Sequence, residues 1–327
     1  MKAVVTGGAG FIGSHLVRAL LDAGIDVRVF DLPQAVRENL AGLPVEWHPG
    51  DLTRPDDVLD ACEGMDLVFH LAALVSDWGE WNLFERVNVG GTRNVLDAAR
   101  VTGSQRTVMM SSLAVHPYTG WRMADETTPR EPGGNPYRRS KILAEDICRE
   151  AVRNGQPVTV IRPGVFPFGE RDRTSFLPLV KALKSGLYVH INRGDALITT
   201  AYAGNLARGM VQAALSERAA GETYILGDAE PVRWRDLMAR IALRVGAPVP
   251  TASVPGWFAD RLSDGFEAVW SRLGRKEAPP LTRYRTSVPQ RDLWFVSAKA
   301  GRHFGYQPET GLNEALDRTV QWWRTVR

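Results

Sequence analysis

A glycine-rich loop near the start of the chain constrains its fold more than any other feature of the sequence. The loop spans residues 6–13, between an apolar run at 2–6 and an amphipathic run at 11–23. Its turn-forming residues are Gly7, Gly10 and Gly13. The first permits a tight turn, the second lets the backbone approach a pyrophosphate, and the third allows a helix to pack closely on a strand. The loop therefore predicts a strand, a turn and a helix that together bind the phosphates of a dinucleotide.

Two further features support this prediction. The expected helix starts at Phe11 and Ile12, where free N–H groups and the positive end of the helix dipole attract phosphate. Asp31 follows a strand-like run at 26–30 and lies eighteen residues after Gly13. A carboxylate there accepts hydrogen bonds from both ribose hydroxyls of NAD and repels the 2′-phosphate of NADP. We predict NAD as the cofactor. Taken alone, the glycine loop could simply form a turn, and Asp31 could simply be a surface residue at the end of a strand.

Short apolar runs alternate with longer amphipathic runs through the first half of the chain, which is typical of βαβ units. The strand-like runs are residues 2–6, 26–30, 45–49, 67–71, 106–111, 158–162 and 223–227. The helix-like runs are residues 11–23, 55–62, 81–101, 137–153 and 205–215. We predict an α/β fold in which 1–165 and 205–227 form a Rossmann, doubly wound parallel sheet. The remaining residues, 166–204 and 228–327, are expected to form a smaller, interleaved C-terminal lobe that binds the substrate.

Composition narrows the class of partner. Among 327 residues, 40 are Lys or Arg and 37 are Asp or Glu, so the net charge of +3 is too small to favour nucleic acid or membrane surfaces. Cys62 and Cys148 are too few for a disulfide framework or a cysteine-based zinc site. No apolar run approaches the length of a membrane span. We expect a soluble, cytoplasmic protein that acts on a small molecule and holds no metal.

A serine, a tyrosine and a lysine indicate the chemistry. Tyr137 and Lys141 are four residues apart on one face of an expected helix, and Ser112 follows the strand-like run at 106–111. Oxidation of a secondary alcohol needs a base for the hydroxyl proton, and the ordinary pKa of tyrosine is too high for that role. We expect the ammonium of Lys141 and the positive nicotinamide together to lower the pKa of Tyr137, and Ser112 to orient the substrate oxygen.

These motifs resemble the extended short-chain dehydrogenases/reductases, the family of NAD-dependent epimerases, dehydratases and 3β-hydroxysteroid dehydrogenases. The resemblance covers nearly the whole chain and includes the 6–13 loop and the 88–95 segment. It implies that Lys141 also binds the nicotinamide ribose and that Asn88 supports the active site. Homodimerisation through the two helices at 81–101 and 137–153 is expected by the same analogy. It implies further cofactor contacts at Asp51, Leu52, Leu71, Ala72, Ala73, Asn88, Tyr137 and Pro163. We interpret His70 as a structural strand residue whose ring nitrogens have hydrogen-bond partners, rather than as a catalyst.

The class of substrate is predicted from the sequence of the substrate-binding lobe. Val165 stands where nucleotide-sugar enzymes often carry an asparagine, whereas the runs at 280–285, 295–300 and 305–308 resemble the steroid-dehydrogenase-like and oxoalkanoate-reductase-like branch. We therefore predict hydride transfer between NAD and a secondary alcohol or ketone of a hydrophobic, steroid-like or β-keto substrate. A nucleotide-sugar epimerase or dehydratase that oxidises C4 transiently is the first alternative. A non-catalytic NAD-sensing module is the second.

Candidate substrate contacts remain open to several interpretations. The chosen residues are Ser76, Trp78, Ser112, Ala114, Gly164, Val165, Arg173 and Arg283. An amphipathic run at 257–273 could cover a hydrophobic substrate or simply pack on the core. Residues 272–291 carry six basic side chains against one acidic side chain. That segment could bind an anionic substrate or be a solvated surface.

Overall fold

A parallel sheet forms the centre of the computed structural model, which describes residues 1–131 and 134–326. Within these residues its seven strands lie in the order β12-β7-β5-β4-β1-β2-β3. The strands are β1 (Lys2–Thr6), β2 (Asp26–Asp31), β3 (Val45–Pro49), β4 (Leu67–His70), β5 (Arg106–Met110), β7 (Val158–Pro163) and β12 (Thr223–Leu226). All neighbouring pairs are parallel. The order reverses between β1 and β4, which is where such sheets bind ligands.

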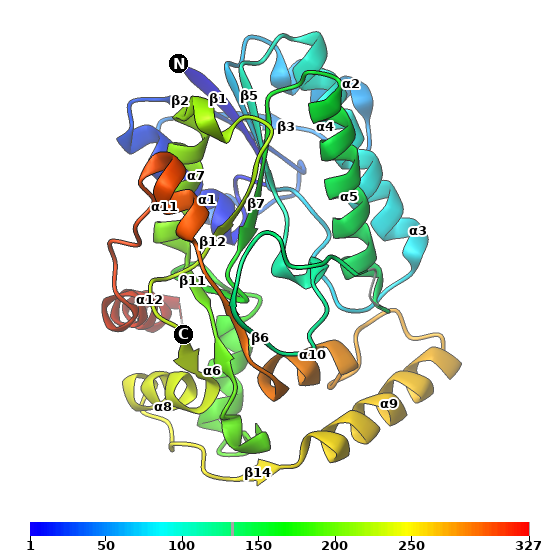
Figure 1. Cartoon of the computed structure of the whole chain (residues 1–327), viewed down its shortest axis with the longest axis vertical. Coiled ribbons are helices and arrows are strands. Elements are labelled where there is room, and N and C mark those ends of the chain that lie inside the picture. The colour runs from blue at the N-terminus through cyan, green and yellow to red at the C-terminus, as the bar shows by residue number, and fades with distance from the viewer. Residues whose placement is uncertain (132–133, 327) are drawn as a thin grey trace.

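Helices cover both faces of this sheet (Figure 1). One face carries α1 (Phe11–Asp22), α7 (Ala203–Leu215) and α11 (Ala298–Phe304), which share a hydrophobic cluster with β1 and β2. The other carries α2 (Pro55–Cys62), α4 (Gly91–Val101) and α5 (Pro136–Arg153). The inner strands β1, β4 and β7 are buried along almost their whole length because helices cover both of their faces, whereas the edge strand β3 is partly exposed. The predicted Rossmann, doubly wound fold is confirmed.

The run at 81–101, predicted as one helix, has three parts. It consists of α3 (Trp81–Phe84), a π-helical turn at Glu85–Gly90 and then α4. A π-helical turn inserts one extra residue into a helix and often marks a functional site. Asn88 lies in this turn, so the turn rotates its side chain relative to a continuous α-helix.

A second sheet organises the lobe. Its strands are β13 (Val232–Arg233), β10 (Leu197–Ile198), β15 (Leu293–Phe295) and β6 (Trp121–Ala124), in that order. The two smaller sheets pair β8 (Phe166–Phe168) with β11 (Thr200–Tyr202), and β9 (His190–Ile191) with β14 (Ser253–Val254). The lobe also contains α6 (Phe176–Lys184), α8 (Trp234–Val245) and α12 (Leu312–Val326). β6 precedes residue 165 but pairs with β15, so the division of the chain at 165 stays a prediction.

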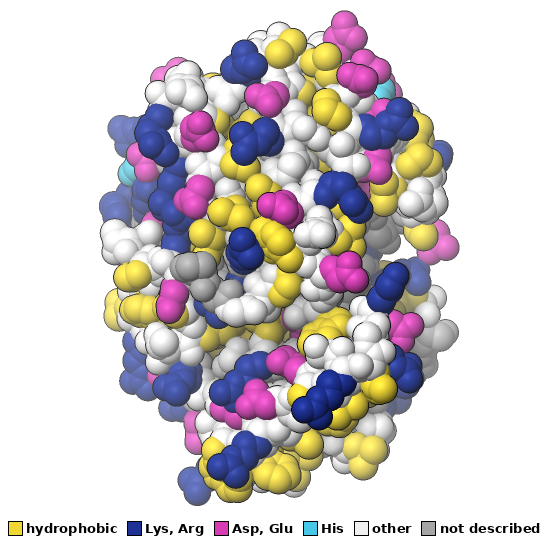
Figure 2. Space-filling view, turned by 90° about the vertical axis from the view of Figure 1, so that its right-hand side faces the viewer, with side chains coloured by type: hydrophobic (Ala, Val, Ile, Leu, Met, Phe, Trp, Pro, Cys, Tyr) yellow, Lys and Arg dark blue, Asp and Glu magenta, His cyan; other side chains and the backbone are white. Residues whose placement is uncertain are grey.

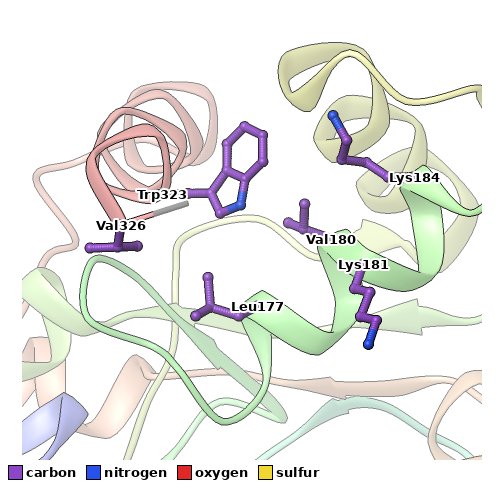
Figure 3. Close-up of a pocket in the computed structure, with 6 residues that line it drawn as sticks. All are labelled: Leu177, Val180, Lys181, Lys184, Trp323 and Val326. Atoms are coloured by element: carbon purple, nitrogen blue, oxygen red, sulfur yellow. The ribbon is translucent and has the colours of Figure 1, made fainter.

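A surface groove of about 370 Å³ lies between α6 and α12 (Figure 3). It is lined by Leu177, Val180, Lys181, Lys184, Trp323 and Val326. None of these residues belongs to the candidate catalytic set. The groove therefore marks where two lobe helices meet.

The lower edge of the molecule is formed by α9 (Gly256–Arg272) and α10 (Arg283–Ser287) (Figure 1). Apolar and charged side chains alternate over this lower part in Figure 2. Trp257 and Leu273 are each 63% exposed, whereas Ala259 and Ser263 are buried. Much of the apolar face of α9 therefore points to solvent instead of lining a pocket. Within residues 1–131 and 134–326, every helix is too short or too polar to cross a bilayer.

Candidate active site

The glycine loop between β1 and α1 leaves no room for side chains. Gly7 has a φ of +70°, and a Cβ there would lie 2.8 Å from the backbone N of Ala72. A Cβ on Gly13 would lie 2.1 Å from the carbonyl oxygen of Gly7, and one on Gly10 would lie 3.1 Å from the same atom. No side chain of the described residues caps the start of α1. The first amides of that helix, at Phe11 and its neighbour Ile12, are therefore suited to bind phosphate.

Asp31 lies over this loop at the end of β2. Its Oδ2 accepts a hydrogen bond from the backbone N of Ala9 at 3.1 Å, and its Oδ1 accepts one from Leu32 at 2.9 Å. Burial raises the pKa of Asp31, while these two N–H groups oppose the rise. The loop and the carboxylate together fit a dinucleotide, because the loop admits phosphate and the acid faces the same side.

The loop after β4 is tied to the glycine loop. Thr6 Oγ1 accepts hydrogen bonds from the backbone N of Leu71 at 3.2 Å and of Ala72 at 3.1 Å. This places the segment that ends in Ala73 beside the turn at Gly7. The three residues after His70 therefore lie at the switch point of the sheet, as a cofactor contact requires.

Three other expected cofactor residues lie around this point. Asp51 orders its own turn, because its Oδ1 accepts hydrogen bonds from Thr53 N at 2.8 Å and Thr53 Oγ1 at 2.9 Å. Leu52 is buried against Gly91, where a Cβ would approach it to 2.5 Å. Pro163 ends β7. Their contacts with a cofactor remain predictions.

His70 is a structural residue. Its Nδ1 lies 3.0 Å from Thr6 Oγ1 and its Nε2 lies 3.0 Å from Thr92 Oγ1. Burial, followed by the nearby charge of Lys141, lowers the pKa of His70 to about 3. The ring is neutral at pH 7, and both of its nitrogens have partners.

Ser112 and Tyr137 meet as the sequence predicts. The Ser112 side chain forms a hydrogen bond with Tyr137 and also accepts one from the backbone N of Ala114 at 3.1 Å. Burial raises the pKa of Tyr137, the neighbouring Tyr284 raises it further, and the bond with Ser112 opposes the rise. Tyr137 is therefore protonated at pH 7.

Lys141 lies close to Tyr137, and its expected effect on the pKa of the tyrosine in the presence of the nicotinamide stays a prediction. Its Nζ donates to the carbonyl oxygen of Met110 at 3.0 Å and lies 6.0 Å from the centre of the Tyr137 ring. Burial lowers the pKa of Lys141 to about 8, against the opposing charge of Glu145. Both members of the pair are therefore desolvated, and burial is the main cause of each pKa shift.

Asn88 connects the π-helical turn to the helix that carries Tyr137. Its Oδ1 accepts a hydrogen bond from Leu74 N at 2.7 Å, and its Nδ2 donates to Leu74 O at 3.0 Å and to Ser140 Oγ at 2.8 Å. Ser140 in turn donates to the carbonyl oxygen of Tyr137 at 2.8 Å. Asn88 therefore holds the first turn of α5 against the loop after β4.

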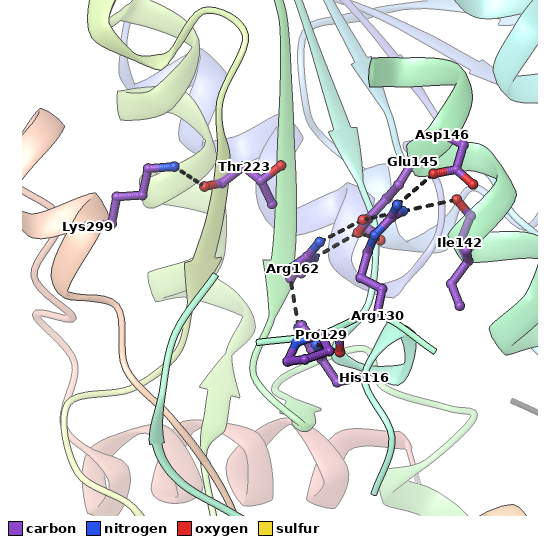
Figure 4. Close-up of polar contacts among 10 residues, drawn as sticks. His116, Pro129, Arg130, Ile142, Glu145, Asp146, Arg162, Thr223 and Lys299 are labelled. Carbon is purple, nitrogen blue, oxygen red and sulfur yellow. Dashed lines mark hydrogen bonds and ion pairs between the residues drawn. The ribbon is translucent and has the colours of Figure 1, made fainter. Parts of the chain in front are cut away.

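A buried ion pair beneath the site was not predicted (Figure 4). Glu145 accepts hydrogen bonds from Arg162 Nε at 2.8 Å, from Arg162 Nη2 at 2.7 Å and from Ser111 Oγ at 2.6 Å. Arg130 Nη1 lies 3.3 Å from the same carboxylate, and His116 Nε2 lies 3.2 Å from Arg162. The pair ties β7 and the end of β5 to α5. The position of Glu145, one turn after Lys141, was the only hint in the sequence.

Two tyrosines next to Tyr137 were also missed. Tyr118 and Tyr284 have hydroxyl oxygens 3.4 Å apart and ring centroids 5.9 Å apart. Both pack on a cluster that contains Tyr137 and the predicted contact Ala114. Burial raises the pKa of Tyr118 to about 12. Together with the other members of the cluster, Leu74, Trp81 and Phe84, these residues give the tyrosine a largely aromatic surrounding.

The basic candidates for substrate binding are engaged elsewhere. Arg173 donates to Glu38 at 2.9 Å, and Arg283 lies 2.9 Å from Asp260 on α9. Neither pair includes a candidate catalytic residue, and both arginines are about half exposed. The structure thus leaves them outside the catalytic group.

The remaining candidates belong to two loops. Ser76 Oγ donates to Trp78 O at 2.7 Å, and Trp78 Nε1 donates to Arg275 O at 3.0 Å. Gly164 lies beside β11, where a Cβ would be 2.5 Å from a carbonyl oxygen, and Val165 packs on the core of the lobe. The loop with Ser76 and Trp78 follows Leu74, which packs in the cluster that contains Tyr137.

A Rossmann sheet with a glycine loop, a strand-end serine and a tyrosine one turn before a lysine defines an enzyme of the short-chain dehydrogenase/reductase class. The model of the 3-beta hydroxysteroid dehydrogenase/isomerase family matches residues 4–255. The chain belongs to this family.

Relatives agree with this assignment. A 2-alkyl-3-oxoalkanoate reductase from Stenotrophomonas maltophilia is 32% identical over 97% of this chain and 98% of its own. A 3 beta-hydroxysteroid dehydrogenase/Delta 5→4-isomerase from Mycobacterium tuberculosis is 31% identical over 98% of this chain and 90% of its own. DesIV, a dTDP-glucose 4,6-dehydratase from Streptomyces venezuelae solved with NAD and TYD bound, is 25% identical with a TM-score of 0.79, covering 99% of this chain and 97% of its own. The prediction of an enzyme of the extended family is confirmed, and the NAD prediction agrees with the cofactor of DesIV.

Proposed function

We propose that this chain is an NAD-dependent oxidoreductase that interconverts a hydrophobic secondary alcohol and its ketone. The observation that carries the proposal is the buried Tyr137, bonded to Ser112 and one helical turn from Lys141, at the switch point of a sheet that fits a dinucleotide. NADH, when bound, supplies the hydride that the carbonyl carbon accepts. In this reduction the hydroxyl of Tyr137 donates its proton to the carbonyl oxygen.

The other residues hold this proton donor in place. Ser112 donates a hydrogen bond to the carbonyl oxygen and so stabilises its developing charge. Asn88 holds the helix that carries Tyr137. Lys141 binds the nicotinamide end of the cofactor, and the glycine loop with Asp31 binds its adenosine end. The raised pKa of Tyr137 keeps its hydroxyl protonated at pH 7, as a proton donor to a ketone must be.

The surroundings of Tyr137 support a hydrophobic substrate. Its neighbours are mainly aromatic and aliphatic side chains, and the two basic candidates Arg173 and Arg283 pair with acids of the chain itself. The names of two relatives, an oxoalkanoate reductase and a 3β-hydroxysteroid dehydrogenase, point to steroid-like or β-keto substrates. A nucleotide sugar would need cationic or amide groups for its pyrophosphate.

Nucleotide-sugar epimerisation or dehydration is the second candidate, favoured by the similarity to DesIV over 99% of this chain. It would use the same tyrosine to oxidise C4 of a sugar transiently. Homodimerisation through α4 and α5 and a cytoplasmic location also stay predictions.

The test compares two substrate panels and one variant. The wild type should oxidise NADH with hydrophobic ketones, and it should leave UDP- and dTDP-sugars unchanged. Tyr137→Phe should lower kcat/KM by about 10²- to 10⁴-fold, because it removes the proton donor. Tyr188→Phe removes a partly buried hydroxyl that accepts a hydrogen bond from Trp234 in the lobe, and it serves as the matched control. Survival of turnover within tenfold in Tyr137→Phe would contradict the mechanism, and sugar interconversion without net cofactor change would favour the second candidate.

A further inference from the structure

Asp77, in the loop after β4, holds the lobe against the sheet domain. Its carboxylate is 7% exposed and binds Arg285 through two contacts, Oδ2 to Nε at 2.8 Å and Oδ1 to Nη2 at 2.9 Å. Thr282 also donates to Oδ2, and its hydroxyl accepts a hydrogen bond from Arg285 N at 3.2 Å at the start of α10. We call Asp77, Thr282 and Arg285 the Asp77 clamp. Paired hydrogen bonds between an arginine and a carboxylate fix orientation as well as distance.

The clamp determines where Tyr284 lies. This tyrosine stands between Arg283 and Arg285, and both neighbours bind acids. Its ring is partly buried in the cluster that contains Tyr137, and it is close enough to raise the pKa of that residue. Tyr284 is thus the residue of α10 that reaches the catalytic tyrosine.

The hydroxyls of Tyr118 and Tyr284 form one hydrogen bond between them, at 3.4 Å. Two hydroxyls carry two O–H donors, and one bond uses only one of them. Within residues 1–131 and 134–326 neither hydroxyl makes another hydrogen bond, so the second donor has no acceptor. This pair therefore has a spare donor in the cluster that contains Tyr137, and it is suited to bind an oxygen of the substrate.

We propose that the Tyr118 and Tyr284 hydroxyls recognise a second oxygen of the substrate, next to the carbonyl that Tyr137 protonates, and that Asp77 is the positioning residue for Tyr284. This inference rests on the proposed function and narrows its substrate class. The preferred ketone is hydrophobic and carries an oxygen acceptor one or two carbons from the reacting carbonyl, as a β-keto ester or a 1,3-diketone does. A ketone without that oxygen leaves this donor unpaired.

The test uses a matched pair of ketones of similar size, a β-keto ester and a simple ketone, with NADH. The wild type should prefer the β-keto ester by about tenfold or more in kcat/KM. Tyr284→Phe should reduce this preference about tenfold. Asp77→Asn should raise KM for the β-keto ester about tenfold and change kcat less, because the tyrosine is mispositioned but the proton donor remains.

Two further variants separate positioning from general damage. Arg285→Gln removes the positive charge beside Asp77 and should raise KM for the β-keto ester. Arg285→Lys keeps that charge and should raise KM less. Asp317→Asn removes an ion pair with Arg244 on the far side of the lobe and should leave the preference unchanged. If Tyr284→Phe leaves the ratio of the two kcat/KM values unchanged, whether or not both values fall, the inference is overturned and the proposed function stays intact. Absence of turnover of both ketones by the wild type would contradict the proposed function and the inference with it.

Discussion

The buried pair of Glu145 and Arg162 makes a quantitative prediction. Glu145→Gln removes the negative charge from a site where the two side chains are 2% and 1% exposed. The guanidinium of Arg162 then stays buried without a counter-charge, since Arg130 is also a cation. Breaking a buried pair on one side is unfavourable by about 3–5 kcal/mol. This is a large part of the 5–15 kcal/mol that stabilises a typical protein.

The assay is equilibrium unfolding in urea at pH 7, followed by circular dichroism. Asp317→Asn serves as the control, because its carboxylate is 66% exposed and such surface pairs contribute at most about 1 kcal/mol. A loss below about 1 kcal/mol in Glu145→Gln, equal to the control, would refute the reasoning. It would mean that water or a shift of Arg162 solvates the guanidinium.

The pH dependence gives a second check on the same variant. Burial by itself raises the pKa of Glu145, but the hydrogen bonds and charge of Arg162 outweigh it and leave the pKa lowered. A lowered folded-state pKa adds stability above the unfolded pKa, and this contribution is lost as the pH falls through the folded value. The difference in stability between wild type and Glu145→Gln should therefore shrink as the pH falls below about 4.

Three other changes test the cofactor site and its support. Gly7→Ala places a Cβ 2.8 Å from Ala72 N at a φ of +70°, so KM for NADH should rise about tenfold or more in steady-state kinetics. Asp31→Ala should reduce the preference for NADH over NADPH about tenfold, and tighter binding of NADPH than of NADH by the wild type would contradict the role of Asp31. Asn88→Leu leaves Leu74 N and O without partners, and it should lower both kcat and the urea midpoint, at a loss of about 2–3 kcal/mol. An unchanged midpoint would show that Asn88 is not needed to hold α5.

The sequence predicted those parts of the site that local chemistry determines. The glycine loop needs residues without a Cβ at fixed spacing, and Asp31 follows its strand at a fixed distance from Gly13. Tyr137 and Lys141 share a helical face because they are four residues apart. Each of these rules acts within a few residues or within one βαβ unit, so no tertiary information is required.

The missed residues depend on contacts between distant segments. Asp77 and Arg285 are separated by 208 positions, and Tyr118 and Tyr284 by 166. An isolated acid, arginine or tyrosine in the sequence does not reveal its partner. The π-helical turn was also missed. One extra residue in a helix rotates the side chains that follow it, but it changes the spacing of the apolar residues too little to be seen in the sequence.

The same distinction decides what the basic segment at 272–291 does. From the sequence it could bind an anionic substrate or lie in solvent, since charge alone does not name a partner. In the structure Arg283 binds Asp260 of the neighbouring helix and Arg285 binds Asp77 of the sheet domain. Two of the six basic side chains thus fasten the lobe around Tyr284 instead of facing a ligand. With these arginines paired to acids of the chain itself, the tyrosines around Tyr137 offer neutral hydrogen bonds rather than free cations, which agrees with the proposal of a hydrophobic ketone rather than a pyrophosphate.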